Sequence, residues 1–147
     1  MLRNARGVRT LGLAVLALVG FLSSAEASSL RVAPIGLKLT AQEPSGTIRT
    51  WNDGNAPMQV QIRVFRWTVE NGEDVLTPTR DVVASPPMAT LLPGAENLIR
   101  IVRISGRPIT GKEGYRLIVD ELPNPANQRA GTVTVLVRHA IPVVFSK

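Results

Sequence analysis

The stretch GTVTVLVRHAIPVVF, residues 131–145, decides the fold, because both faces of the strand that it predicts carry apolar side chains. One parity is almost wholly apolar and consists of Val133, Val135, Val137, His139, Ile141, Val143 and Phe145. The other parity is mixed and consists of Thr132, Thr134, Leu136, Arg138, Ala140, Pro142 and Val144. A strand with one face in a core needs only one apolar set. The second set therefore either lies in a buried central strand or awaits a partner.

The first 27 residues have the pattern of a cleavable secretory signal peptide. Three arginines precede the apolar run 11–22, and Ala25-Glu26-Ala27 offers small residues for cleavage. This run is shorter than the roughly 20 residues that a membrane-spanning helix needs. The sequence therefore predicts an exported chain, residues 28–147, which is long enough for a single domain with one core.

Charge and cysteine content narrow the classes of function. The whole chain has 17 basic and 11 acidic residues, and residues 28–147 keep 14 and 10 of them, a net charge of +4. An excess of this size suits a local anion site better than a nucleic-acid footprint, so we expect no nucleic-acid partner. The chain has no cysteine, which fits a bacterial periplasmic domain held together by its core and rules out thiolate metal sites and thiol catalysis.

Alternation of apolar residues and turn signals predicts seven short strands between residue 28 and the end of the chain. The clearest is Met58 to Val69, where Val60, Ile62 and Val64 point one way, and Asn71-Gly72 after it is a hairpin signal. Leu30 to Thr40 reads as one first strand that Pro34 confines to an edge or bends near Gly36. The others are predicted at 47–51, 81–85, 97–104, 115–122 and 131–145. No helical periodicity separates these strands, so the expected fold is all-β: a seven-stranded immunoglobulin-like antiparallel sandwich without the antibody disulfide.

Several segments together resemble the periplasmic pilus-assembly, or fimbrial, chaperones. In the order of the family they are Val32–Leu39, Asn52–Pro57 with Val60-Gln61, Ser85-Pro86-Pro87 with Leu92-Pro93-Gly94, Leu98–Ile101, Tyr115–Leu117 through Glu121–Pro123, and Arg138–Phe145. Each is weak alone, but jointly they are specific and cover nearly all of residues 28–147. The ending Ile141-Pro142-Val143-Val144-Phe145 is most similar to the archaic or alternate branch.

The resemblance implies a binding function and no enzyme. Members of the family hold a pilin subunit that lacks its last strand, and they lend their own seventh strand to fill the groove. Carried over by position, the donor residues are Val133, Val135 and Val137. The implied partners are a pilin-like subunit and an outer-membrane usher, in the periplasm, with no cofactor.

The resemblance also implies a grip on the terminal carboxylate of the subunit. In the better-studied branch an arginine of the first strand and a lysine of the seventh supply it, and the matching positions here are Gly36 and Pro142, which cannot. Lys38 and Arg138 have the same parities as these two positions and are the nearest substitutes. The family has a second sandwich, which would begin after Lys147. We therefore expect either a truncated chain or a one-domain relative.

Other interpretations stay open beside this one. The three valines are also typical of an ordinary central strand, although the family resemblance favours the donor interpretation. A sandwich with an exposed last strand would self-associate as a homodimer or structural subunit. His139 is the only histidine, and with no cysteine or paired carboxylates around it we expect neither a metal site nor catalysis. Trp51, Phe65 and Trp67 are expected to pack in the core. Asp120 and Glu121 are expected to pair with Arg100 or Arg116.

Overall fold

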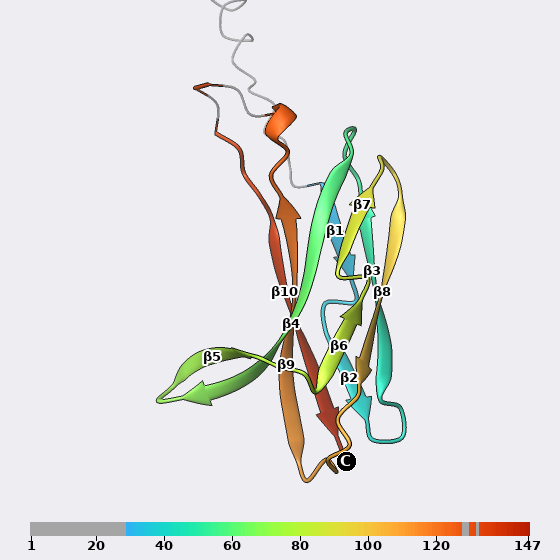
Figure 1. The fold of residues 1–147 in the computed structure, drawn as a ribbon, viewed down its shortest axis with the longest axis vertical. Coiled ribbons are helices and arrows are strands. Elements are labelled where there is room, and N and C mark those ends of the chain that lie inside the picture. Colours follow the sequence, from blue (N-terminus) through green and yellow to red (C-terminus); the bar gives the residue numbers. More distant parts are fainter. Residues whose placement is uncertain (1–28, 128–129, 132) are drawn as a thin grey trace, which may run out of the picture.

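The computed structural model describes residues 29–127, 130–131 and 133–147. The predicted signal peptide, residues 1–27, lies outside the described residues. Ten strands and one short 3₁₀ turn make up this part of the chain (Figure 1). They are β1 (Leu30–Ala33), β2 (Leu37–Thr40), β3 (Ser45–Asn52), β4 (Met58–Glu70), β5 (Glu73–Pro78), β6 (Val82–Ser85), β7 (Met88–Leu91), β8 (Glu96–Arg103), β9 (Lys112–Leu122), η2 (Pro125–Asn127) and β10 (Arg138–Ser146).

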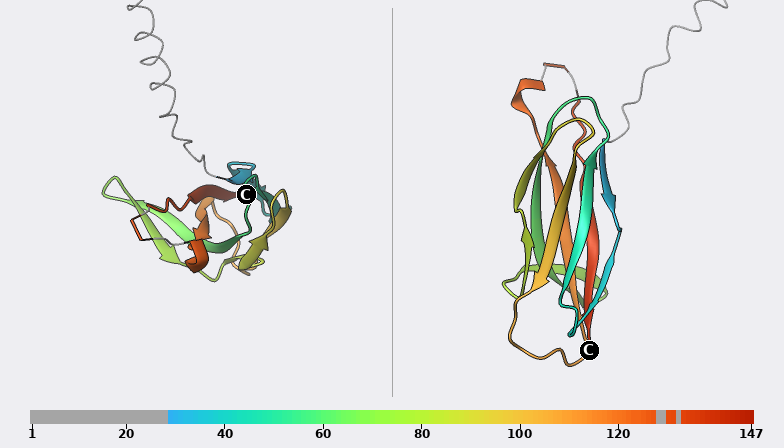
Figure 2. Two further views of the ribbon diagram at one scale, coloured as in Figure 1. Left: turned by 90° about the horizontal axis from the view of Figure 1, so that it is seen from above. Right: turned by 90° about the vertical axis from the view of Figure 1, so that its right-hand side faces the viewer.

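The strands form two sheets that face each other, as the predicted sandwich requires (Figure 2). One sheet has the order β1-β3-β8-β6, and the other has the order β2-β10-β9-β4-β5 with β7 paired to β4. The immunoglobulin-like fold class is thus confirmed, with ten strands in the described residues instead of seven. All pairs are antiparallel except that of β2 and β10, which is parallel. No helix among the described residues is long and apolar enough to cross a membrane.

The predicted first strand is wrong in one respect, because it is split between the two sheets. β1 pairs with β3 in one sheet, whereas β2 pairs with β10 in the other. The chain crosses over at Pro34 and Gly36, and the backbone at Gly36 lies against the Pro142 ring of β10, where an added Cβ would be 3.5 Å from its Cγ. A second crossing at Pro86 and Pro87 separates β6 from β7, a strand that the sequence pattern missed.

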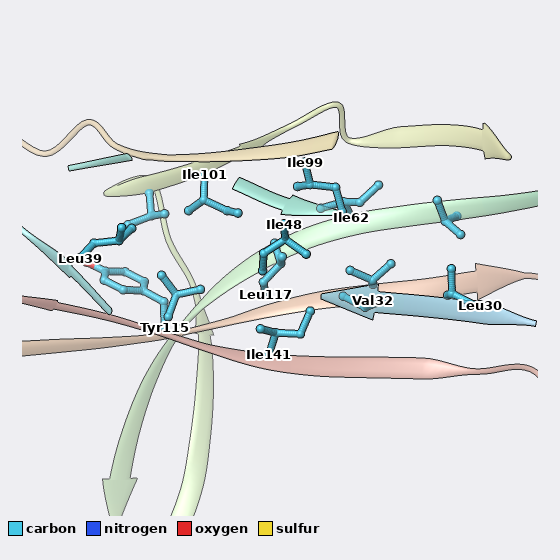
Figure 3. Packing of buried hydrophobic residues seen from close by; sticks show 14 of the residues in the cluster. Leu30, Val32, Leu39, Ile48, Ile62, Ile99, Ile101, Tyr115, Leu117 and Ile141 are labelled. Atoms are coloured by element: carbon cyan, nitrogen blue, oxygen red, sulfur yellow. The ribbon is translucent and has the colours of Figure 1, made fainter. Parts of the chain in front are cut away.

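The core fills the space between the sheets (Figure 3). β4 contributes Val60 and Ile62, as the alternation predicted, and β10 contributes Ile141, Val143 and Phe145. The Phe145 ring meets the Tyr115 ring edge to face, with 5.7 Å between centroids. The core-facing residues of β10 share the parity of Val133, Val135 and Val137. This parity therefore points into the sandwich wherever β10 is inside it.

The hairpin signal at Asn71-Gly72 is confirmed. Both residues have positive φ, 52° and 82°, as a two-residue turn between antiparallel strands requires, and they join β4 to β5. The far half of this hairpin extends sideways from the sandwich in Figure 1. Asn52, the last residue of β3, is fully buried, and its side chain bonds the backbone of Gly54, Ala56 and Leu91.

The predicted last strand is too long at its beginning. β10 starts at Arg138, and residues 133–137, which we call the lead-in segment, are not in a strand. Their neighbour would be the continuation of β9, but β9 ends at Leu122 and is followed by Pro123 and Pro125. Proline has no N–H for a ladder, so in the described part of the chain no strand pairs with residues 133–136, and only Val137 is hydrogen-bonded to the end of β9.

Candidate functional site

The lead-in segment exposes two of the three valines that the resemblance nominated. Val133 is 91% exposed and Val135 is 79% exposed, whereas Val137, next to β10, is half-buried. Leu136, on the other parity, is 42% exposed. Val133 and Val135 thus continue the core-facing parity of β10 beyond the end of the sandwich, where the described residues leave both side chains largely uncovered.

The first half of β10 also has an open edge, which we define as the side of Arg138–Pro142 that faces away from β9. β2 pairs only with residues 143–146, so within the described residues no strand lies beside Arg138–Pro142 on this side. The Glu121 amide donates to the Val137 carbonyl toward β9 (2.9 Å), and the Ala41 amide donates to the Ser146 carbonyl on the opposite side (3.1 Å). Because backbone direction alternates along a strand, Arg138 and Ala140 turn their N–H and C=O groups to the open edge.

Lys38 and Arg138, the two predicted anchor residues, are not brought together. Lys38 is exposed and lies opposite Val144, six residues from Arg138, which is about 20 Å along the strand. The Arg138 Nε lies 2.5 Å from an oxygen of Asp120, and Arg63 holds the other oxygen of that carboxylate. The expected pairing of Asp120 with Arg100 or Arg116 is therefore wrong.

Asp120 is nearly buried between these two guanidinium groups, with 11% of its side chain exposed. Burial alone raises the pKa of Asp120, but hydrogen bonds from Arg138 and Arg63 outweigh it and hold the pKa below its ordinary value. Asp120 therefore stays charged, and Arg138 already has an acidic partner inside the domain.

A different arginine lies next to the positions that the resemblance indicated. Gly36 lies beside Pro142, where an added Cβ would be 3.5 Å from Pro142 Cγ, and Arg116 of β9 is the cross-strand partner of Pro142. Its guanidinium lies 3.9 Å from the centre of the Trp67 ring. Arg116 Nη1 and Trp67 Nε1 are both buried without a hydrogen-bond partner among the described residues. The only ion pair of Arg116 in the described chain is a long one, 3.9 Å to Asp74.

The Trp67 ring lies on the backbone of Gly114, where a Cβ would be 2.7 Å from Trp67 Cε3. Gly114 is the cross-strand partner of Val144, and Val144 is the partner of Lys38. Directly paired residues point to the same face of a sheet, so Lys38 and Arg116 rise on the same outer face, on either side of Pro142 and Val144. The Arg116 guanidinium stacks on Trp67 of β4, whereas Lys38 of β2 is at the opposite edge of the β9–β10 pair.

The expectation that Trp51, Phe65 and Trp67 pack in the core is wrong. All three are only partly buried and lie on outer faces of the sheets, where they are covered by Arg31, Arg63 and Arg116, with 3.9–5.5 Å from guanidinium to ring centre. The alternation of side chains within a strand predicts this outward direction. Trp51, for example, lies an odd number of residues after the buried Ile48 and Thr50 and therefore points to the opposite face. Arg63 and Phe65 lie two residues apart on one face of β4, a spacing that is visible in the sequence. The other two pairs join neighbouring strands and have no such signal.

A second charged cluster holds the loop between β8 and β9. Arg103 donates two hydrogen bonds to Glu113 (2.8 and 3.0 Å) and two more to the carbonyls of Ser105 and Arg107. The Arg103 guanidinium holds the pKa of Glu113 below its ordinary value, and burial raises the pKa of Tyr115 beside it. Every donor of this cluster has a structural partner, so it serves the fold.

The described residues offer no candidate metal site. They contain no group of three or more histidine, aspartate or glutamate side chains that could hold a metal ion. His139 Nε2 lies 3.0 Å from the Leu30 carbonyl oxygen, a contact that ties β10 to β1.

The fold and the site together define an immunoglobulin-like sandwich whose last strand has an open edge and an exposed apolar lead-in segment. The chain belongs to the pili and flagellar-assembly chaperones, since the model of their PapD N-terminal domain matches residues 29–146. This family is not enzymatic. The resemblance drawn from the sequence is thereby confirmed. No curated protein matches the chain.

Solved structures of pilus chaperones have the same fold. CsuC of Acinetobacter baumannii, solved with the tip adhesion subunit CsuE of archaic Csu pili, is 28% identical with a TM-score of 0.70, over 81% of this chain and 57% of that one. The Escherichia coli chaperone DraB is 24% identical (TM-score 0.61; 80% and 55%). SafB of Salmonella enterica, solved with the SafA pilin, is 19% identical (TM-score 0.65; 84% and 56%). The chain thus spans a little over half the length of these relatives.

Proposed function

We propose that this protein is a periplasmic chaperone that binds pilin-like subunits by donor-strand complementation during fimbria assembly. The observation that carries the proposal is the lead-in segment, where Val133 and Val135 are exposed on the parity that β10 otherwise uses for the core. A chaperone of this kind would work with an outer-membrane usher and needs no cofactor. The signal-peptide pattern of residues 1–27 supports the periplasmic location.

The open edge supplies the backbone half of such an interaction. A partner strand beside Arg138–Pro142 can pair with the N–H and C=O groups of Arg138 and Ala140 and with the C=O of Pro142. Pro142 lacks an N–H, and at an edge this costs the domain no internal bond. The exposed valines supply the apolar half, because burying each one in a groove of the partner is worth at most ~1.5–3 kcal/mol.

Lys38 and Arg116 are the proposed anchor for the carboxylate at the end of the subunit. Both are cations on the outer face that Gly36 and Pro142 share, and the buried Nη1 of Arg116 has no hydrogen-bond partner among the residues that the structure describes. If the C-terminus of the subunit is held there, the last strand of the subunit would run along the open edge from the end near Val133 to the end near Pro142. It would then have the same direction as β10 and be parallel to it. Arg138, engaged by Asp120, is not the anchor in this proposal.

Co-expression with the pilin-like subunits encoded in the same genome tests this function. We expect one of them to co-purify with the wild-type chain, and Val135→Asp to abolish the complex while the domain stays folded. Unfolding of this variant would instead mean that the valine belongs to the core. Failure of every subunit to bind the folded wild-type chain would refute the chaperone function.

A second candidate, self-association through the same edge, is favoured by the apolar character of the lead-in segment. Sedimentation of the purified chain separates the two. A concentration-dependent homodimer that no pilin-like subunit dissociates would support a structural role, whereas dissociation of the dimer by a subunit would support the chaperone.

A further inference from the structure

The end of β9 holds the beginning of β10 through two consecutive acidic residues. The Glu121 amide donates to the Val137 carbonyl, and the Val137 amide donates to Glu121 Oε2 at 3.3 Å. In a regular antiparallel pair the second bond would go to the Glu121 carbonyl. The next residue is held in the same way, since Arg138 donates to the Asp120 carboxylate. The ladder between the two strands therefore ends on side chains.

Asp120 is fixed from both sides. Arg63 of β4 binds the oxygen that Arg138 leaves free, so one carboxylate links β4, β9 and β10. A shallow depression of about 430 Å³ lies here, lined by Gln61, Arg63, Asp120, Glu121, Leu122, Leu136, Val137 and Arg138. These contacts hold three charged side chains together beside Val137, where the lead-in segment ends and β10 begins.

Leu136 gives the segment a second contact with the domain. It lines the depression just described and also a neighbouring one of about 440 Å³, each time together with Glu121 and Leu122. It is about half as exposed as Val133 or Val135. Leu136 thus lies toward the end of β9, while the valines on the other parity face outward.

We propose that Asp120 and Glu121 form a latch that positions the lead-in segment for its partner. Glu121 ends the ladder at Val137, Asp120 fixes Arg138, and the chain before them leaves the sheet in one direction, with its backbone unpaired. This inference rests on the proposed chaperone function. It assigns Glu121 a positioning role, and it assigns Arg138 to the latch.

The physical benefit is preorganisation. A free segment that samples many directions must lose this freedom when a subunit binds, whereas a latched segment has lost much of it already. The latch also acts against the competing hairpin, in which residues 133–136 would fold back along an extended β9. Pro123 and Pro125 oppose the same hairpin, because neither can donate to the ladder.

The test compares Glu121→Ala with Glu121→Gln, which keeps an oxygen that accepts the Val137 amide. We expect the Val137 amide to exchange roughly fivefold faster or more in the alanine variant, and within about twofold of wild type in the glutamine variant. Both variants should keep the wild-type Tm, because Glu121 is not in the core. The dissociation constant for the pilin-like subunit that binds wild type should rise severalfold in the alanine variant only.

Unchanged exchange and unchanged affinity in Glu121→Ala would overturn the latch, as would a glutamine variant as impaired as the alanine variant. The two proposals fail separately. If wild type binds no pilin-like subunit, the chaperone function is refuted, and the exchange rate of Val137 alone decides whether the latch exists. If wild type binds and neither variant differs from it, the latch is refuted and the chaperone function stands.

Discussion

Replacement of Val135 by alanine should weaken partner binding and leave the fold intact. The side chain is 79% exposed in the free domain, so its truncation should change the free energy of unfolding by less than about 0.5 kcal/mol. In a complex that buries the side chain, the loss of two carbon groups at ~0.8 kcal/mol each weakens binding by roughly 1.5 kcal/mol, about tenfold in the dissociation constant.

Val143→Ala is the matched control, because Val143 has the same side chain and the same parity further along the strand but is fully buried. It should lower the free energy of unfolding by roughly 2 kcal/mol, since the transfer of two carbon groups and a cavity both count. Chemical denaturation measures the stability of both variants, and calorimetric titration with the subunit measures their affinities.

The two positions should therefore behave in opposite ways. A Val135→Ala domain as destabilised as Val143→Ala would place Val135 in the core and refute the reasoning. An unchanged affinity of a stable Val135→Ala domain would refute it equally, because an exposed valine that contributes nothing to binding is not a donor residue.

Three further predictions concern the proposed anchor residue Arg116, the packing of Trp67 on Gly114, and the loss of stability at acidic pH. Arg116→Gln should weaken subunit binding at least tenfold in titrations at low salt, and by a smaller factor at high salt. If the substitution weakens the binding of a subunit without its terminal carboxylate by the same factor, Arg116 is not the anchor. Gly114→Ala should lower stability in urea by about 2 kcal/mol or more, because the new Cβ would lie 2.7 Å from Trp67 Cε3, and a neutral result would place the ring elsewhere. The folded pKa of Glu113 lies below its ordinary value of 4.5, so its contribution to stability is full above that pH and is lost as the pH falls through the folded pKa. In Glu113→Gln the free energy of unfolding should depend less on pH in the acidic range. It should also be lower at neutral pH, because a neutral glutamine is a weaker partner for Arg103.

Local patterns in the sequence were enough for the elements that depend on local chemistry. The alternation of Val60 and Ile62 located the long strand β4, and Asn71-Gly72 located the hairpin, because both signals follow from backbone geometry. The jointly specific segments around 52–57, 85–94 and 138–145 gave the family.

The elements that the sequence left undetermined depend on which strands become neighbours. Nothing in Leu30–Thr40 states that its halves lie in opposite sheets, because the crossover depends on whether β3 or β10 is nearby. The true start of β10 was hidden for the same reason. Val133 and Val143 look alike in sequence, and only the end of β9 at Leu122 separates an unpaired valine from a core valine.

The candidate site was predictable in part. Val133, Val135, Val137 and Lys38 were nominated from the resemblance; in the structure Val133 and Val135 are exposed ahead of the open edge, and Lys38 lies on the outer face. Arg116, the cation proposed here for the anchor, was not nominated because its proximity to Gly36 and Pro142 arises from the pairing of β9 with β10. Arg138 was nominated because it has the same parity as Pro142. Parity within one strand cannot show that Arg138 lies opposite Asp120 of β9 and binds its carboxylate.

Hydrogen–deuterium exchange of the chain, free and bound to a pilin-like subunit, tests the central claim most directly. If the lead-in segment and the open edge pair with a strand of the subunit, the amides of Thr134, Leu136, Arg138 and Ala140, which face the side of the open edge, should become strongly protected in the complex. Amides of β3 and β8 in the opposite sheet should be unchanged. Protection confined to other parts of the domain, with residues 133–140 exchanging as fast as in the free chain, would contradict donor-strand binding.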